Sequence, residues 1–230
     1  MKQFKVFLSL VIVIVFSSFV FAGSVCDESL QKLMDGNKRY VDGKFANKDV
    51  GSTKRQELSS KGQKPFAIVV TCSDSRVPPE ILFDQGLGDI FVVRVAGNVV
   101  DPIALGSVEY GAEHLNSPLV FILGHTKCGA VTATLEAKGK PEGNIGAIVK
   151  KIQPAAAVAK KKGGTKEEML ETAIHENIKN VYNDMMKNSK ILPHLVHEGK
   201  LKIVGGEYDI TTGKVAMMEL PKKAESKKSH

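Results

Sequence analysis

Four short runs of apolar residues, rich in β-branched side chains, recur along the chain. They span 66–71, 90–95, 119–123 and 201–204. Because they are apolar on both faces, they are typical of the central strands of a parallel sheet that is covered by helices. A fifth strand is predicted at 214–220, since the preceding Thr211-Thr212-Gly213 is typical of a hairpin turn. This strand would return along one edge of the sheet.

Apolar residues at helical spacing occupy much of the chain between these runs. The predicted helices span 27–41, 53–61, 103–114, 130–137, 146–161 and 173–187. Asp27 is expected to cap the first of them. The alternation predicts an α/β fold: a mostly parallel open sheet of four central strands plus an antiparallel edge strand, with helices on both faces and an N-terminal helical arm. No repeat or long linker divides the chain, so residues 23–230 are expected to form a single domain.

The first 22 residues have the layout of a secretory signal peptide. Lys2 and Lys5 precede an apolar run over 6–21, and cleavage is expected after Ala22. An uncleaved membrane anchor is the alternative, but the run is shorter than the ~20 residues that a membrane span needs. A lipoprotein is disfavoured because Cys26 follows a valine. The protein is therefore expected to be periplasmic or secreted, without a stable membrane anchor after cleavage.

Composition and charge narrow the class of protein. The 230 residues (24.9 kDa) are 43% hydrophobic and 25% charged, which fits one folded domain. The formal charge of +7 arises largely from a lysine run at 160–162 and from a tail at about 221–230, expected to be flexible. Tryptophan is absent and aromatic residues do not interleave the lysines, so no nucleic-acid partner is expected. Three cysteines are too few for a disulfide framework.

Three potential metal ligands follow two of the predicted strands. Cys72 directly follows the first run, and His125 and Cys128 follow the third. Because the carboxyl ends of parallel strands meet at one edge of a sheet, these side chains are expected to converge. A lone cysteine there is usually a small buried hydrophobe, but two thiols and an imidazole together are good zinc ligands. Three protein ligands leave a fourth position open, as in catalytic zinc sites.

Asp74 and Arg76 add a second element to this edge. They are two residues apart, so in extended backbone they would face the same side as Cys72. An arginine can hold a carboxylate through two hydrogen bonds and favour its charged form. One interpretation is a salt bridge that fixes a loop. Beside a metal, Asp74 could instead orient a bound hydroxide, or bind the metal itself if Arg76 releases it.

These motifs resemble those of the β-class carbonic anhydrases. The resemblance covers roughly residues 28–220. The segments that carry it are Cys72-Ser73-Asp74-Ser75-Arg76, His125-x-x-Cys128-Gly129, Val77-Pro78-Pro79-Glu80, 91–98, Glu109-Tyr110 and 199–213. It implies a zinc enzyme that interconverts carbon dioxide and bicarbonate, with one Zn²⁺ per chain, assembled as a homodimer or a multiple of dimers. By this resemblance Cys72, His125 and Cys128 hold the zinc, and hydroxide formed at the fourth position attacks carbon dioxide.

The resemblance also implies roles for four further residues. Asp74, paired with Arg76, would orient the hydroxide, and the backbone amide of Gly129 would face the substrate. Gln63, in the segment Gly62-Gln63-Lys64-Pro65, would reach across a dimer to the substrate of the partner chain. In a closed form of the family Asp74 would replace water as an alternate zinc ligand. The Gln63 segment and the absence of tryptophan favour the open form.

Alternatives remain open for the function and for the cysteines. The same scaffold and zinc triad serve relatives that hydrolyse carbonyl sulfide or carbon disulfide, and a non-catalytic zinc protein is a third possibility. If the protein is exported, its apo form could oxidise to a Cys72–Cys128 disulfide. Cys26 is the odd thiol, which pairs between chains or stays free.

Overall fold

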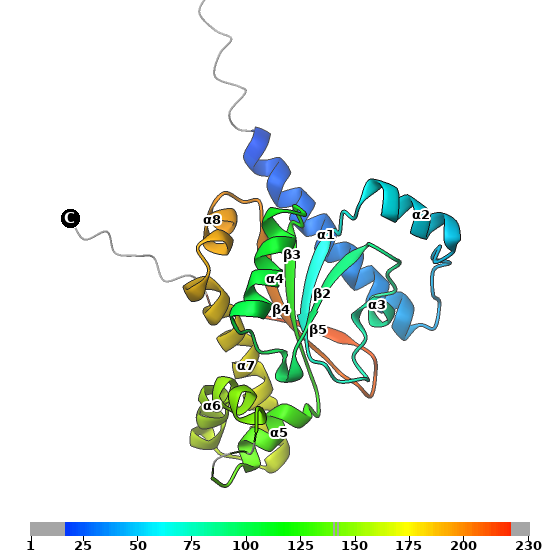
Figure 1. The fold of residues 1–230 in the computed structure, drawn as a ribbon. Coiled ribbons are helices and arrows are strands. Elements are labelled where there is room, and N and C mark those ends of the chain that lie inside the picture. Colours follow the sequence, from blue (N-terminus) through cyan, green and yellow to red (C-terminus); the bar gives the residue numbers. More distant parts are fainter. Residues whose placement is uncertain (1–16, 140, 142, 222–230) are drawn as a thin grey trace, which may run out of the picture.

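A five-stranded sheet forms the centre of the computed structural model, which describes residues 17–139, 141 and 143–221, with side chains from Val25 onward. The strand order is β2-β1-β3-β4-β5 (Figure 1). The strands are β1 (Ala67–Thr71), β2 (Ile90–Arg94), β3 (Leu119–His125), β4 (Lys202–Tyr208) and β5 (Val215–Met218). The first four run parallel and β5 pairs antiparallel with β4, which confirms the predicted sheet. β3 and β4 run further than the apolar runs at 119–123 and 201–204.

Helices cover both faces of the sheet, as predicted. Ile68 and Val70 of β1 face a core shared with α4 (Pro102–Glu113), α6 (Ile145–Lys162) and α7 (Lys166–Asn188). Val69 lies on the other face, in a core shared with α1 (Ser17–Val41) and α3 (Pro79–Leu82). Every residue of β1 and β3 is buried, which explains why these strands lack polar alternation.

The remaining helices are short segments around this framework. They are α2 (Ser52–Lys61), the 3₁₀ turn η1 (Ala96–Asn98), α5 (Gly129–Glu136) and α8 (Ile191–His197). The sequence pattern did not predict α3, η1 or α8, because each is too short to show a helical period. α7 begins seven residues before the predicted helix at 173–187. Its start is a capping box in which Thr165 and Glu168 bond each other's backbone.

The N-terminal arm α1 is longer than expected. It begins at Ser17, so Asp27 lies inside the helix and does not cap it. Asp27 instead pairs with Lys202 of β4 at 2.6 Å. Residues 1–16 of the predicted signal peptide lie outside the described residues, and the cleavage position falls within α1. Of the helices that the structure describes, none has the length and apolar character needed to cross a membrane.

The predicted hairpin closes the sheet. Asp209 Oδ1 accepts hydrogen bonds from the amides of Thr211 and Thr212, at 2.7 and 3.2 Å. Gly213 has a φ of +76°, which favours glycine at the end of this turn. β5 ends at Met218, before the predicted end at residue 220, and the tail beyond residue 221 lies outside the described part of the chain.

Candidate metal centre

The structure brings Cys72, His125 and Cys128 together at the carboxyl edge of the sheet. Cys72 directly follows β1, His125 is the last residue of β3, and Cys128 precedes α5. β1 and β3 are neighbours, with Thr71 opposite Leu123, so both ends meet at the same edge. The three ligand atoms lie within 4.8 Å of one another and all three residues are buried.

The imidazole of His125 is oriented for a metal. Its Nδ1 lies 2.8 Å from the carbonyl oxygen of Thr126, and a carbonyl only accepts, so Nδ1 carries the proton. Nε2 is therefore the nitrogen with a free lone pair. It is buried and has no hydrogen-bond partner among the described residues. Such an atom is costly unless something binds it, and a zinc ion would do so.

The thiols of Cys72 and Cys128 have pKa values that depend on each other. Hydrogen bonding to Cys128 lowers the pKa of the Cys72 thiol to about 4, and the Gly97 amide, 3.2 Å from Cys72 Sγ, adds to this shift. The same contact and burial raise the pKa of Cys128, so the pair shares one proton. Burial opposes the charge on His125, but the Cys72 thiolate outweighs it and raises the pKa of His125. A divalent cation would displace these protons. The donor set, with the free Nε2, fits zinc.

Asp74 lies beside the three ligand atoms, held by Arg76. Arg76 Nε and Nη2 donate to the two carboxylate oxygens at 2.9 and 2.7 Å, and Asp74 Oδ2 lies 3.9 Å from His125 Nε2. These bonds hold the pKa of Asp74 well below its usual range. The backbone is not extended as expected: the Val77 amide donates to the Asp74 carbonyl at 3.0 Å, so residues 74–77 form a turn.

The two residues expected to contact substrate are placed differently. Gly129 is the first residue of α5, is exposed, and has no described atom within 4 Å of the position that a Cβ would take. Its backbone therefore borders open space next to Cys128. Gln63 is exposed in the segment before β1, at the amino end of the strand. The structure thus places Gln63 at the opposite end of β1 from Cys72 of the same chain.

Comparison with known proteins decides the family. Residues 67–215 match the family model described as carbonic anhydrase. The chain belongs to the β-class carbonic anhydrases. A carbonic anhydrase of Mycolicibacterium smegmatis is 42% identical over 188 residues, which cover 80% of this chain and 89% of the relative. Carbonic anhydrase 2 of Mycobacterium tuberculosis is 37% identical over 191 residues, covering 81% and 90%. A solved β-carbonic anhydrase of Aspergillus fumigatus superposes with a TM-score of 0.67 at 26% identity, covering 74% of this chain and 85% of that one.

Three residues that support the site in this carbonic anhydrase were not singled out from the sequence. Thr126 supplies the carbonyl that orients His125, and Gly97 donates to Cys72. Arg94 donates to the carbonyl oxygens of Cys72 and Asp74, at 3.1 and 2.6 Å. Thr126 and Gly97 act through backbone groups, which residue type does not reveal. The signal for Arg94 was its position: it is the one charged residue in the run at 90–95.

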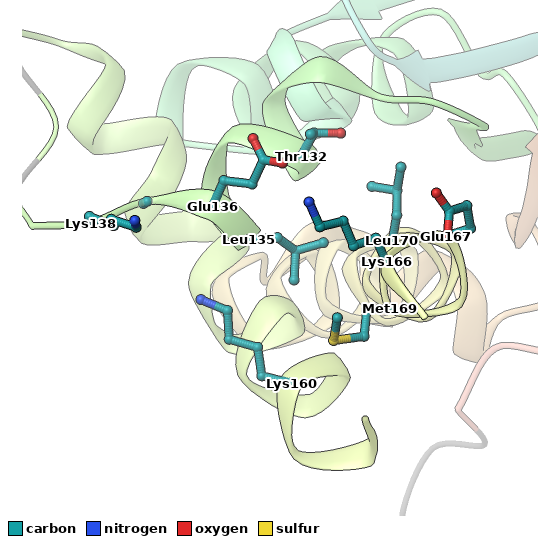
Figure 2. Close-up of a pocket in the computed structure, with 10 residues that line it drawn as sticks. Thr132, Leu135, Glu136, Lys138, Lys160, Lys166, Glu167, Met169 and Leu170 are labelled. Atoms are coloured by element: carbon teal, nitrogen blue, oxygen red, sulfur yellow. The ribbon is translucent and has the colours of Figure 1, made fainter. Parts of the chain in front are cut away.

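A separate pocket of about 770 Å³ lies between α5, α6 and α7 (Figure 2). Leu135, Met169 and Leu170 line it together with Lys160 and Lys166. None of the three candidate metal ligands lines this pocket. The pocket is therefore separate from the Cys72, His125 and Cys128 cluster at the strand ends.

Proposed function

We propose that the chain catalyses the reversible hydration of carbon dioxide to bicarbonate and a proton, with one zinc ion held by Cys72, His125 and Cys128. The observation that carries this proposal is a cluster whose ligand atoms lie within 4.8 Å of one another and in which His125 Nε2 is buried without a partner among the described residues, in a member of the carbonic anhydrase family. A zinc ion bound there supplies a Lewis acid that brings the pKa of water to about 7, which provides a nucleophile near neutral pH.

Asp74 and Arg76 orient the nucleophile. Because Arg76 keeps Asp74 ionised, the carboxylate only accepts hydrogen bonds. Asp74 therefore takes a hydrogen bond from the attacking oxygen and leaves a lone pair of that oxygen directed at the carbon atom. The Gly129 amide donates to an oxygen of the substrate. The Arg76 contacts support the open form, since Asp74 would have to leave Arg76 to become the alternate metal ligand.

Stopped-flow hydration of carbon dioxide, with metal quantification on the same samples, tests this proposal. The parent is expected to carry about one zinc per chain and to hydrate rapidly. Cys128→Ser should lose both zinc and activity. Asp74→Asn should keep zinc but lose activity about 10²-fold or more, and Asp49→Asn, an exposed control, should match the parent. Full zinc occupancy without hydration in the parent would contradict the proposal.

We also propose that two chains complete each other's sites. Gln63 lies at the opposite end of β1 from its own Cys72, so it can act only on a neighbouring chain. Next to the edge strand β2, helix α4 exposes Ile103 (81%) and Tyr110 (48%), apolar surface that a second copy would bury. Ile103→Asp should give monomers in analytical ultracentrifugation and lose activity. Gln63→Ala should leave the assembly intact but lower kcat/KM. An active Ile103→Asp monomer would contradict this arrangement.

Export of the chain is a further part of the proposal. It rests on the lysines and apolar run of residues 1–22, followed by the expected cleavage after Ala22. Cell fractionation with mass measurement of the intact chain tests it. A periplasmic or secreted product that begins at Gly23 is expected. A full-length chain confined to the cytosolic fraction would contradict it.

A further inference from the structure

Asn177 of α7 is a buried polar residue with no role in the steps above. Only 1% of its surface is exposed. Its Nδ2 donates to the carbonyl oxygen of Gly97 at 2.7 Å, with a longer contact of 3.5 Å to Asn98 Oδ1. Its own Oδ1 is buried without a partner among the described residues. Burying an oxygen without a partner is costly, so Oδ1 gives no reason for an asparagine at this position. The bond from Nδ2 to the Gly97 carbonyl does.

The turn that Asn177 holds is a constrained one. Gly97 and Asn98 have φ angles of +68° and +46°, two consecutive residues in the left-handed region. Glycine adopts this conformation freely, and asparagine is among the few other residues that tolerate it. A Cβ on Gly97 would also lie 2.6 Å from Ile152 Cδ1. The turn therefore has little freedom, and the Asn177 amide fixes the direction of its central carbonyl.

The same turn reaches the metal centre. The Gly97 amide donates to Cys72 Sγ at 3.2 Å, so one residue is held by Asn177 through its carbonyl and contacts the sulfur through its amide. An N–H···S bond withdraws electron density from a thiolate and fixes its direction. Groups that orient a metal ligand in this way are typically worth 10–100-fold in metal affinity.

We propose that Asn177 is a positioning residue for the metal, which holds the Gly97 amide on the Cys72 sulfur. The inference rests on the proposed zinc site. Its test compares Asn177→Asp with Ser117→Ala. Aspartate has the shape of asparagine, but when ionised it cannot donate to the Gly97 carbonyl. Ser117 is equally buried and donates to the Pro65 carbonyl at 2.7 Å, but at the amino end of the sheet, so its loss weakens the fold without touching the site.

Three measurements on the full chain separate positioning from stability: zinc release to a chelator, the sulfur-to-cobalt charge-transfer band of the Co²⁺-substituted protein, and urea unfolding. Asn177→Asp should release zinc about 10-fold faster or more, and its band should move to lower energy because the sulfur is more electron-rich. Ser117→Ala should lower stability and leave both other readouts at the parent values.

Asn177→Ser provides the same readouts with a smaller perturbation if the aspartate variant does not fold. Zinc release within two-fold of the parent, in whichever Asn177 variant folds, would overturn the inference. Equal changes in Ser117→Ala would overturn it too, because the effect would then follow stability alone. A parent chain that binds no zinc would overturn the proposed function and the inference with it.

Discussion

Gly124 directly precedes His125 on β3, and α7 packs over it. A Cβ at Gly124 would lie 2.6 Å from Ile178 Cδ1, 2.9 Å from Ile178 Cγ1 and 3.3 Å from Ile174 Cγ2. Carbon atoms pack at about 3.5–4.0 Å, and Ile178 is fully buried, so it cannot move without displacing its neighbours. Gly124→Ala should therefore force α7 away from β3. The expected loss in the free energy of unfolding is about 1–3 kcal/mol.

Ile178→Val tests the cause of this loss, since it removes the methyl group nearest to the new Cβ. Alone it should cost about 0.5–1.5 kcal/mol. In the double variant the closest of the three contacts is absent, so the combined cost should fall below the sum by about 1 kcal/mol. Urea unfolding followed by circular dichroism measures all four proteins.

The control for this cycle is Gly146→Ala near the start of α6. Among the described atoms, a Cβ at Gly146 would meet only the Pro141 carbonyl oxygen, at 3.7 Å, which is an ordinary contact. This substitution should stabilise the chain by up to about 1 kcal/mol, because alanine favours the helix. Additive costs for Gly124→Ala and Ile178→Val, or a Gly124→Ala variant as stable as the parent, would refute the reasoning.

Three further predictions concern the metal centre. Thr126→Val removes the hydroxyl that accepts a hydrogen bond from the Ile210 amide at 3.1 Å. It should lower the free energy of unfolding by about 1–3 kcal/mol and speed zinc release to a chelator, whereas Thr126→Ser should match the parent. Equal release from both variants would contradict this. Arg76 holds the pKa of Asp74 below its unfolded value of about 3.9, so this carboxylate stabilises the fold above that pH and its contribution is lost as the pH falls through the lower folded pKa. The stability gap between the parent and Arg76→Gln, measured by urea unfolding at successive pH values, should therefore be constant near neutrality and begin to narrow below about pH 4. A gap unchanged down to about pH 2 would count against it. The sulfurs of Cys72 and Cys128 lie within 4.8 Å of each other, so the metal-free chain should oxidise in air to a Cys72–Cys128 disulfide while the zinc-loaded chain stays reduced. Mass mapping under non-reducing conditions checks this. Free thiols in the metal-free chain would contradict it.

The sheet was predictable because its central strands are buried on both faces. That burial demands continuous apolar runs such as 66–71 and 119–123, and residues that follow such strands share one edge. The convergence of Cys72, His125 and Cys128 could be predicted for this reason. The spacing of Asp74 and Arg76 left two interpretations, a salt bridge that fixes a loop or a pair that orients a bound hydroxide, and the family resemblance favoured the second.

The supporting contacts could not be predicted in the same way. Thr126 and Gly97 act through backbone atoms, and the bond from Asn177 to Gly97 joins residues 80 positions apart. Such contacts depend on how α7 packs on the sheet, which no local pattern encodes. The turn at residues 74–77 was missed because the prediction assumed extended backbone, in which side chains two residues apart face the same side. That alternation does not show where a strand ends. The start of α7 was missed although Thr165 and Glu168 have the spacing of a capping box, a signal present in the sequence.

The placement of the three ligands has a mechanical consequence. Cys72 and His125 are 53 positions apart, and their neighbouring strands are joined by backbone hydrogen bonds and by a bond from the Thr71 hydroxyl to the Leu123 carbonyl. A metal ion shared by these ligands would close this span as a removable cross-link. A covalent cross-link around a loop of this length would destabilise the unfolded chain by about 4 kcal/mol. A chelator that removes the metal would therefore abolish the proposed catalysis and would also remove the cross-link between β1 and β3.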